Sequence, residues 1–268
     1  MPEARPLRVV LCGISGRMGR ALATRIAQLH DLRVVGGIDR QDTDTRDAGT
    51  PVETPESAGP LIAGCDVVID FSAPPFLHDL IRLRAAEFAG RALVSGTTGV
   101  DAETEAALVD LSRHAALVRA ANFGLGVNLL LALVERAARA LPMHSWDTEI
   151  VEAHHRDKAD APSGTALALG EAVARARGQA LDEVRRDGRS GRPGARPAGE
   201  IGFHSLRGGA VTGEHRVLFL GTSERIELSH LAESRALFAD GALAAARWVA
   251  GRAPGRYTMA DVLGLGSP

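Results

Sequence analysis

Residues 152–166 read EAHHRDKADAPSGTA, and this segment carries side chains that can move protons beside a fixed positive charge. His154 and His155 can exchange protons near neutral pH. Lys158 adds a cation within the same segment. A strand-like stretch, EIVEA, precedes the histidines and would deliver them to the end of a strand. The segment alone therefore indicates acid–base chemistry on an anionic molecule.

A helix start is expected in the second half of this segment. Pro162 suits the first turn of a helix, and ALALGEAVA continues with a helical pattern, so we expect a helix to begin near 162–165. The positive end of that helix would present the amides of Ser163, Gly164 and Thr165, and glycine leaves room for close approach. Such a helix end is suited to binding a carboxylate.

Other interpretations of the segment stay open at this level. A metal site could use the histidines and the nearby carboxylates. However, adjacent residues of a strand point to opposite faces, the spacing lacks the H-E-x-x-H pattern, and Lys158 would repel a metal ion. A polar loop with satisfied histidines is the plain structural alternative. The acid–base interpretation explains more of these residues together, and we expect no metal.

A glycine-rich turn follows the first apolar run, LRVVLC (7–12). Residues 12–20 read CGISGRMGR, with glycines at 13, 16 and 19. Such a turn lets the backbone approach a pyrophosphate, and the helix after it offers its N-terminal amides to that anion. The next apolar run, LRVVGGID, ends at Asp39 and is followed by Arg40. The acidic residue can bind ribose hydroxyls and the arginine can pair with a 2′-phosphate, so NADH and NADPH both remain candidates.

Two further loops follow later strands, at the edge where open parallel sheets bind ligands. SGTTG (95–99) offers the hydroxyls of Thr97 and Thr98. AANFG (120–124) offers the amide of Asn122 and the flat apolar ring of Phe123. We expect these loops to contact the nicotinamide end of the cofactor. Arg17, at the expected helix start, could lie near the phosphates or be a solvated arginine.

The elements that must position these residues follow two patterns. Short apolar runs alternate with helical patterns up to residue 120, which predicts an α/β fold with a Rossmann-type, doubly wound parallel sheet. A loop rich in Gly, Pro, Asp and Thr interrupts the alternation over 40–60. The pattern changes after Asn122. A long apolar helix over 124–141 and longer strands follow there, and they predict a second, α+β domain with an open mixed sheet.

The composition is that of an ordinary globular chain and narrows its partners. The 268 residues are 45% hydrophobic and 24% charged, with a net charge of −2. This charge gives no broad field for nucleic acid or an acidic membrane, and no apolar run reaches transmembrane length. The first apolar run is too short for a secretory signal, and Cys12 and Cys65 lie at or beside apolar runs as buried thiols would. We expect a cytoplasmic protein with a small-molecule substrate and no nucleic-acid or membrane partner.

These blocks together resemble the 4-hydroxy-tetrahydrodipicolinate reductase (dihydrodipicolinate reductase) family. The most specific of them, EAHHRDKADAPSGTAL, is similar to the family's signature nearly residue for residue. The order and spacing of further blocks also resemble the family: GISGRMGR, VIDFS, SGTTG, AANFGLGVN, GEIGFHSLRGG, TGEHRV and ERIELSHLAESRALFADGAL. The family's own glycine loop has the G-x-x-G-R-M-G form, so the departure from G-x-G-x-x-G does not count against the resemblance.

The resemblance implies an activity and an organisation. The activity is the reduction of 4-hydroxy-tetrahydrodipicolinate, a dicarboxylate, to tetrahydrodipicolinate with NADPH or NADH, in the diaminopimelate route to lysine. The organisation is a dinucleotide-binding domain (1–124), a substrate-binding and oligomerisation domain (125–234), and a C-terminal helix (235–268) that returns to the first domain. It also implies a homotetramer assembled through the sheet of the second domain.

The resemblance further implies roles for single residues. His154 would be the proton donor or acceptor and Lys158 a proton donor. The implied substrate contacts are His155, Ser163, Gly164, Thr165 and Thr98. The implied cofactor contacts are Gly13, Ile14, Ser15, Gly16, Arg17, Met18, Asp39, Arg40, Gly96, Thr97, Thr98, Ala120, Ala121, Asn122 and Phe123.

Two other functions remain as alternatives. One is a related NAD(P)-dependent amino-acid dehydrogenase of the aspartate dehydrogenase kind, against which the HHxxKxDAPSGT block argues. The other is a catalytically silent nucleotide sensor, which would not need both His154 and Lys158 intact. The sequence leaves the preference between NADH and NADPH open, because Asp39 is suited to the ribose hydroxyls of NADH and Arg40 to the 2′-phosphate of NADPH.

Overall fold

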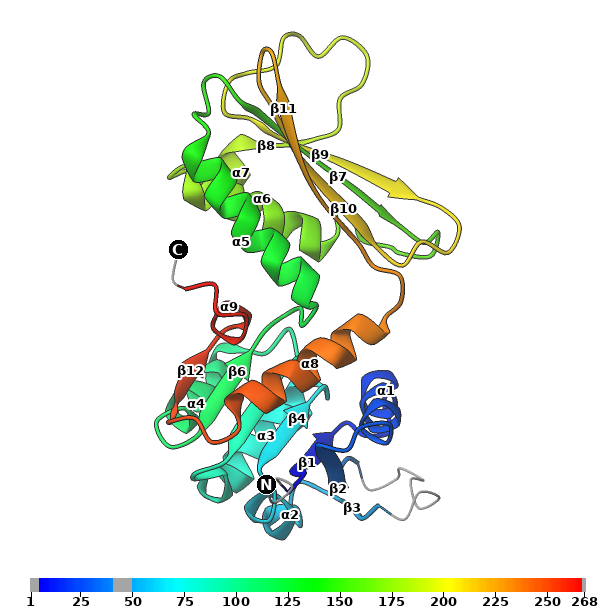
Figure 1. Cartoon of the computed structure of the whole chain (residues 1–268), viewed down its shortest axis with the longest axis vertical. Helices are drawn as coiled ribbons and strands as arrows, with labels where there is room; N and C mark the ends of the chain where they lie inside the picture. Colours follow the sequence, from blue (N-terminus) through cyan, green and yellow to red (C-terminus); the bar gives the residue numbers. More distant parts are fainter. Residues whose placement is uncertain (1–4, 41–49, 267–268) are drawn as a thin grey trace. The chain divides into compact units, whose positions relative to one another are not determined.

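The computed structural model describes residues 5–40 and 50–266, and the chain forms two compact units (Figure 1). Unit 1 holds the described residues of 1–124 together with 236–264. Unit 2 holds 125–235 and the end of the described chain. Part of the loop expected over 40–60, namely residues 41–49, lies outside the described residues.

The described strands of unit 1 form a seven-stranded sheet in the order β12-β6-β5-β4-β1-β2-β3. All its neighbouring strands are parallel. The strands are β1 Leu7–Cys12, β2 Leu32–Ile38, β3 Val52–Glu53, β4 Val67–Asp70, β5 Ala92–Ser95, β6 Ala116–Arg119 and β12 Gly255–Tyr257. The chain runs outward from β1 in one direction and then outward from β4 in the other. The carboxyl ends of β1 and β4 therefore form the switch point at which such sheets bind ligands.

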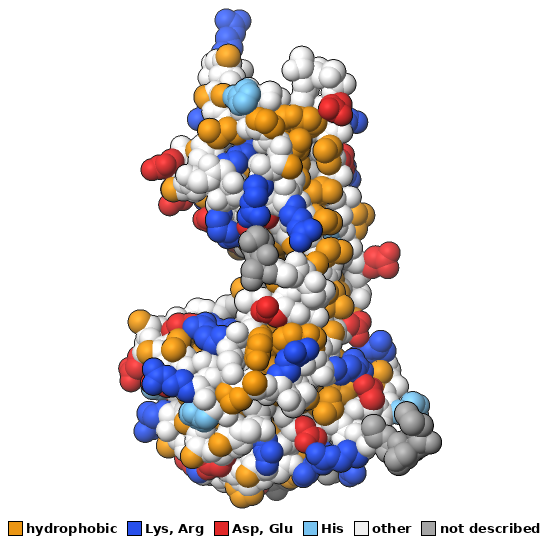
Figure 2. All heavy atoms as spheres, turned by 60° about the vertical axis from the view of Figure 1, so that its left-hand side comes forward, with side chains coloured by type: hydrophobic (Ala, Val, Ile, Leu, Met, Phe, Trp, Pro, Cys, Tyr) orange, Lys and Arg blue, Asp and Glu red, His pale blue; other side chains and the backbone are white. Residues whose placement is uncertain are grey.

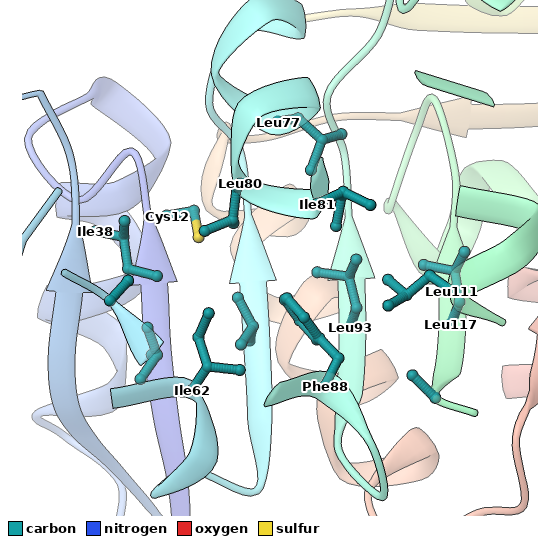
Figure 3. Packing of buried hydrophobic residues seen from close by; sticks show 14 of the residues in the cluster. Cys12, Ile38, Ile62, Leu77, Leu80, Ile81, Phe88, Leu93, Leu111 and Leu117 are labelled. Atoms are coloured by element: carbon teal, nitrogen blue, oxygen red, sulfur yellow. The ribbon is translucent and has the colours of Figure 1, made fainter. Parts of the chain in front are cut away.

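Helices cover both faces of this sheet. They are α1 Arg17–Ile26, α2 Gly59–Ala63, α3 Pro74–Arg84 with the 3-10 turn Ala85–Phe88, α4 Ala102–Leu111, α8 Ala236–Val249 and α9 Met259–Val262. A cluster of buried residues, including Ile62, Leu80, Phe88 and Leu93, packs α2, α3 and α4 on the sheet (Figure 3). Each such side chain contributes about 1.5–3 kcal/mol by burial. The α8 helix packs against α1 and against β4, β5 and β6.

The strands described in unit 2 form a five-stranded mixed sheet in the order β11-β10-β7-β9-β8. They are β7 Asp147–His154, β8 Arg185–Asp187, β9 Ile201–Arg207, β10 Glu214–Leu220 and β11 Arg225–Leu231. The described helices of the unit are α5 Leu125–Ala140, α6 Gly164–Ala176 and α7 Leu181–Val184. A core that includes Val134, Ile150, Leu169 and Phe219 joins α5 and α6 to one face of the sheet.

The other face of this sheet has no described helix of unit 2 packed on it (Figure 1). Leu206, Ala153, Glu214 and Leu231 form one cross-strand row. Successive side chains of a strand alternate between faces, and His215, next to Glu214, is buried on the helix side. The row therefore lies on the open face, where Leu206 is 54% and Leu231 56% exposed.

The fold class expected from the sequence is confirmed. The apolar runs at 7–12, 32–39, 65–72, 92–96 and 116–120 correspond to β1, β2, β4, β5 and β6. The pattern did not predict β3, β8 and β12, because strands of two or three residues are too short to show a period. Among the described helices, none is both long and apolar enough to cross a membrane.

Candidate active site

The glycine turn after β1 packs so closely that side chains would not fit at two of its glycines. Gly13 has a φ of +72°, and a Cβ there would lie 3.0 Å from the carbonyl oxygen of Phe71. A Cβ on Gly19 would overlap the carbonyl oxygen of Gly13 and lie 2.6 Å from the Cα of Ile14. The turn and the first turn of α1 are thus in backbone contact, which holds the positive helix end at the switch point.

The other residues expected to contact the cofactor in this turn differ in exposure. Ile14 is buried, and a Cβ on Gly37 would lie 2.7 Å from its side chain, so Ile14 could reach a ligand only with its backbone. Gly16 and Arg17 are exposed, and Met18 is half-buried. Gly16 is the N-cap residue of α1.

Asp39 and Arg40 lie beside this turn. Asp39 Oδ2 accepts hydrogen bonds from the amide of Ser15 (2.9 Å) and from its hydroxyl (2.5 Å). A cavity of about 310 Å³ lies here, lined by Gly13, Ser15, Gly16, Asp39, Arg40, Phe71, Ser72, Ala73 and Phe76. A second cavity of about 310 Å³ shares Arg40 and Phe76 with the first. Arg40 therefore borders both cavities.

A buried carboxylate joins the loops after β4 and β5. Asp70 is fully buried. Its Oδ1 accepts hydrogen bonds from the amide (3.1 Å) and hydroxyl (2.5 Å) of Ser72, and its Oδ2 accepts one from Ser95 Oγ (2.7 Å). Sequence reasoning missed this residue, although an aspartate at the end of the apolar run VVID was a usable signal. Asp70 fixes the shape of the switch-point edge on which the next loop is built.

The loop after β5 carries an unpaired hydroxyl. Thr97 is 4% exposed, and its Oγ1 has no hydrogen-bond partner among the described residues. A buried polar atom of this kind fits a site where a ligand supplies the missing hydrogen bond. Gly96 packs against the ring of Phe71, which a Cβ would enter, and Thr98 is exposed. The glycine turn, the two cavities and Thr97 therefore fit a dinucleotide cofactor.

The structure corrects the expectation for Phe123. Its ring is 1% exposed and packs edge-on against Phe71, with centroids 5.6 Å apart, so it offers no flat surface to a ligand. Its backbone also touches α8, because a Cβ on Gly241 would overlap the Phe123 carbonyl oxygen. Any contact from Phe123 must come from its backbone. In the same loop Ala120 is half-buried, Ala121 is exposed, and Asn122 Oδ1 accepts the Gly124 amide at 2.8 Å.

In unit 2 the end of β7 holds a histidine against a buried carboxylate. His154 Nδ1 lies 2.5 Å from Glu152 Oε2. Arg207, at the end of β9, donates to both Glu152 oxygens, at 2.9 Å and 2.8 Å. Burial alone would raise the pKa of Glu152, but hydrogen bonds from Arg207, Ser205 and His154 lower it to about 2. Glu152 is therefore ionised at neutral pH and accepts hydrogen bonds from its neighbours.

The helix start lies next to this pair, within the expected range 162–165. The α6 helix begins at Gly164, with Ser163 as the N-cap and Pro162 before it. Ser163 is 2% exposed, its Oγ accepts the amide of Ala166 (3.2 Å), and its own amide donates to Glu152 (3.2 Å). Ser163 is thus occupied within the protein. The part of the helix end that faces solvent is Gly164, which is exposed, and a Cβ there would meet nothing within 4 Å.

A second histidine supports the helix start. His215 is 4% exposed, and its Nε2 lies 3.1 Å from Ser163 Oγ. Burial, and then repulsion from His154, lower the pKa of His215 to about 4. The two rings meet edge to face with centroids 5.2 Å apart. His215 is therefore neutral at pH 7, and it holds the N-cap rather than carrying protons.

Lys158 and His155 complete the segment on its more exposed side. Lys158 Nζ donates to both oxygens of Asp160, at 2.8 Å and 2.9 Å, and this hydrogen bond lowers the pKa of Asp160. His155 Nε2 lies 3.3 Å from Arg235 Nη2. The segment thus carries the cation Lys158, and a second cation, Arg235, lies beside His155. Arg235 was not expected from the sequence, because it lies 80 residues away.

The structure gathers the expected residues into two groups. His154, His155, Lys158, Ser163, Gly164 and Thr165 lie on one segment of unit 2. Thr98 lies in unit 1 with the expected cofactor contacts. Sequence reasoning missed Glu152, Arg207 and His215. Within 5–40 and 50–266, no group of three or more His, Cys, Asp or Glu side chains could hold a metal ion.

The surface charge of the protein is mixed in sign. On the face drawn in Figure 2, acidic and basic side chains are interspersed, in keeping with a net charge of −2. An anionic ligand would therefore be recognised by single side chains and the helix end rather than by a broad field on this face.

A doubly wound sheet with a glycine turn at its switch point, and a second unit with a charge-held histidine beside a helix end, define an NAD(P)-dependent oxidoreductase. The chain belongs to the dihydrodipicolinate reductase family: the family's N-terminal domain matches residues 7–123 and its C-terminal domain residues 126–263. It is 47% identical to a 4-hydroxy-tetrahydrodipicolinate reductase of Parvibaculum lavamentivorans, over 97% of this chain and 98% of that relative. It is 49% identical to the one from Methylocella silvestris, with the same coverage.

Solved structures agree with the fold. A dipicolinate-bound dihydrodipicolinate reductase from Paenisporosarcina sp. TG-14 is 24% identical, with a TM-score of 0.77 over 94% of this chain and 97% of that one. A probable dehydrogenase from Thermotoga maritima is 11% identical, with a TM-score of 0.61 over 96% of this chain and 92% of that one. At these identities the likeness establishes the architecture.

Proposed function

We propose that this chain is an NAD(P)H-dependent reductase that converts 4-hydroxy-tetrahydrodipicolinate to tetrahydrodipicolinate in the diaminopimelate pathway of lysine biosynthesis. The observation that carries the proposal is the segment 152–166, where Glu152 contacts both His154 and the N-cap of α6, and Arg207 links Glu152 to the backbone of Lys158. Relatives of nearly the same length that are 47% and 49% identical bear the reductase name. The alternative of an aspartate dehydrogenase-like enzyme is not favoured.

The residues of unit 1 are assigned to the cofactor, which supplies the hydride when bound. The amides at the start of α1 and the glycines at 13 and 16 would take the pyrophosphate. Asp39 would bind ribose hydroxyls, and Arg40 would pair with the 2′-phosphate of NADPH. Thr97 would give its unpaired hydroxyl to the nicotinamide end. The remaining assigned contacts are Ile14, Ser15, Arg17, Met18, Gly96, Thr98, Ala120, Ala121, Asn122 and Phe123.

The residues of unit 2 are assigned to the dicarboxylate and to proton transfer. The amides of Gly164 and Thr165 would receive one carboxylate at the positive end of α6, with Ser163 holding that end in place. His155 would contribute to binding the anion, and Thr98 of unit 1 is the further substrate contact assigned from the family. His154 or Lys158 would then deliver a proton to the carbon next to the reduced one. For Lys158 this step requires release from Asp160, and an incoming carboxylate would compete for the same ammonium group.

The open face of the unit 2 sheet supports a homotetramer as the working assembly. The row containing Leu206 and Leu231 presents large apolar side chains that no described helix of the unit covers. Such a face is expected to pair with a second copy. Leu206→Glu combined with Leu231→Glu should lower the mass of the assembly in analytical ultracentrifugation, whereas an unchanged mass would move the interface elsewhere. Membership of the reductase family supports a place in the cytoplasm.

The activity is tested by coupling the protein to a synthase that produces 4-hydroxy-tetrahydrodipicolinate. NADPH and NADH consumption are followed by absorbance in separate reactions. Oxidation of either cofactor that depends on the synthase product supports the proposal. If NADPH or NADH is oxidised with oxaloacetate and ammonia, but not with the synthase product, the chain is an aspartate dehydrogenase-like enzyme instead.

A further inference from the structure

The buried carboxylate Glu152 stands two residues before His154, and both side chains lie on the same face of β7. It is 1% exposed, and its Oε2 lies 2.5 Å from His154 Nδ1. No feature of the proposed reaction requires a carboxylate at this place. Its contacts therefore need a separate explanation.

The charge on Glu152 decides which nitrogen of His154 carries a proton. Arg207 donates to both oxygens of the carboxylate, at 2.9 Å and 2.8 Å, and keeps it ionised. An ionised carboxylate can only accept hydrogen bonds. His154 Nδ1 must therefore be the donor in the 2.5 Å contact, and Nε2 is left as the nitrogen that can exchange a proton.

A glycine, and not a residue with a side chain, borders His154 Nε2. Gly213 lies beside it, and a Cβ there would approach Nε2 to 3.1 Å. The ring of His215 packs against that of His154, with the two ring planes 73° apart. The His154 side chain keeps 11% of its surface exposed, in contrast to the fully enclosed Glu152.

The same carboxylate also holds the helix end. Glu152 Oε1 accepts the amide of Ser163 at 3.2 Å, and Ser163 caps α6 through Ala166. A single side chain thus contacts both the proton carrier and the N-cap of the helix expected to bind the substrate carboxylate.

We propose that Glu152 is a positioning residue. It fixes His154 in the Nδ1-protonated tautomer, with Nε2 directed to the substrate. It also holds the start of α6 at a fixed position relative to His154. Arg207 serves this arrangement as the counter-charge of Glu152. The inference deepens the proposed function and rests on it for the kinetic outcome, but the tautomer can be measured independently of activity.

The tautomer is measured by long-range ¹⁵N–¹H NMR on histidine-labelled protein at pH 8, with His154→Asn used to assign the resonance. The wild-type protein should show His154 protonated at Nδ1 and bare at Nε2. A proton on Nε2 instead would overturn the inference. This measurement needs no variant at position 152, so it stands even where Glu152→Gln folds poorly.

The kinetic test compares three variants. Glu152→Gln should lower kcat by about 10- to 100-fold, because a misplaced His154 loses part of the rate enhancement that proton transfer supplies. The Kd for NADPH should change by less than about twofold. Glu152→Asp keeps the charge and should recover part of kcat. Glu135→Gln is the matched control: Glu135 is a buried carboxylate of the same unit, and its ion pairs are with Arg139 and Arg175.

Equal kcat losses in Glu152→Gln and Glu135→Gln, or no recovery in Glu152→Asp, would mean that Glu152 serves stability alone. A wild-type protein without reductase activity would refute the proposed function instead. In that case the NMR result still decides whether Glu152 fixes the tautomer.

Discussion

Replacing Glu152 with glutamine should change how the stability of unit 2 depends on pH. The folded-state pKa of Glu152 is about 2, against an ordinary value of 4.5. Because the folded value is depressed, the stabilisation is fully present above the unfolded pKa and is lost as the pH falls through the folded one. At 1.36 kcal/mol per pH unit this amounts to about 3 kcal/mol in total, of which about 1 kcal/mol is lost by pH 4 and about 2 kcal/mol by pH 3.

The assay is urea unfolding at fixed protein concentration between pH 7 and pH 3. The chain has two tryptophans, and Trp146 lies in unit 2 while Trp248 lies in unit 1. A Trp248→Phe background therefore makes the fluorescence report unit 2 alone. The free energy of unfolding is compared between this background and the same background carrying Glu152→Gln, so that the titration of every other group cancels.

The difference in unfolding free energy between the two forms should stay constant from pH 7 to about pH 5 and then shrink as the pH falls. Parallel loss of stability in both forms down to pH 3 would refute the reasoning. It would mean that Arg207 does not hold Glu152 ionised in the folded protein.

Two further predictions concern unit 1. Arg40→Ala should weaken NADPH binding by about tenfold, which corresponds to about 1.4 kcal/mol, and leave NADH binding within about twofold, as measured by fluorescence titration; equal losses for both would place the 2′-phosphate contact elsewhere. Gly19→Ala should destabilise unit 1 by about 1–3 kcal/mol and weaken both cofactors together, because the new Cβ meets the backbone of Gly13 and Ile14; unchanged cofactor binding would show that this turn is not the pyrophosphate site.

Local patterns were sufficient for the parallel sheet and its glycine turn. A strand, a glycine turn and a helix follow one another within twenty residues at Leu7–Ile26, so their signals are contiguous. The side chains of the segment 152–166 are also contiguous, so proton transfer and anion binding could be proposed for them without knowing the fold. The start of α6 at Gly164 falls within the expected range 162–165, with Pro162 just before the N-cap Ser163.

Long-range contacts could not be predicted in this way. Arg207 reaches Glu152 across 55 residues, and His215 reaches Ser163 across 52. These contacts depend on which strand lies next to β7 and in which register, and neither is encoded in a local period. The alternation Glu152, Ala153, His154 was a usable signal, because it places a carboxylate and a histidine on one face of a strand. The burial of Phe123 could not be predicted either, because α8, which packs against it, lies more than a hundred residues further along the chain.

The central claim is that unit 1 binds the cofactor while the segment 152–166 moves the proton. Steady-state kinetics and NADPH titration of Lys158→Ala test this claim most directly. Removing an acid–base group should lower kcat by about 100-fold or more while the Kd for NADPH stays within about twofold. Comparable losses in kcat and in NADPH affinity, or an unchanged kcat, would contradict this division of roles.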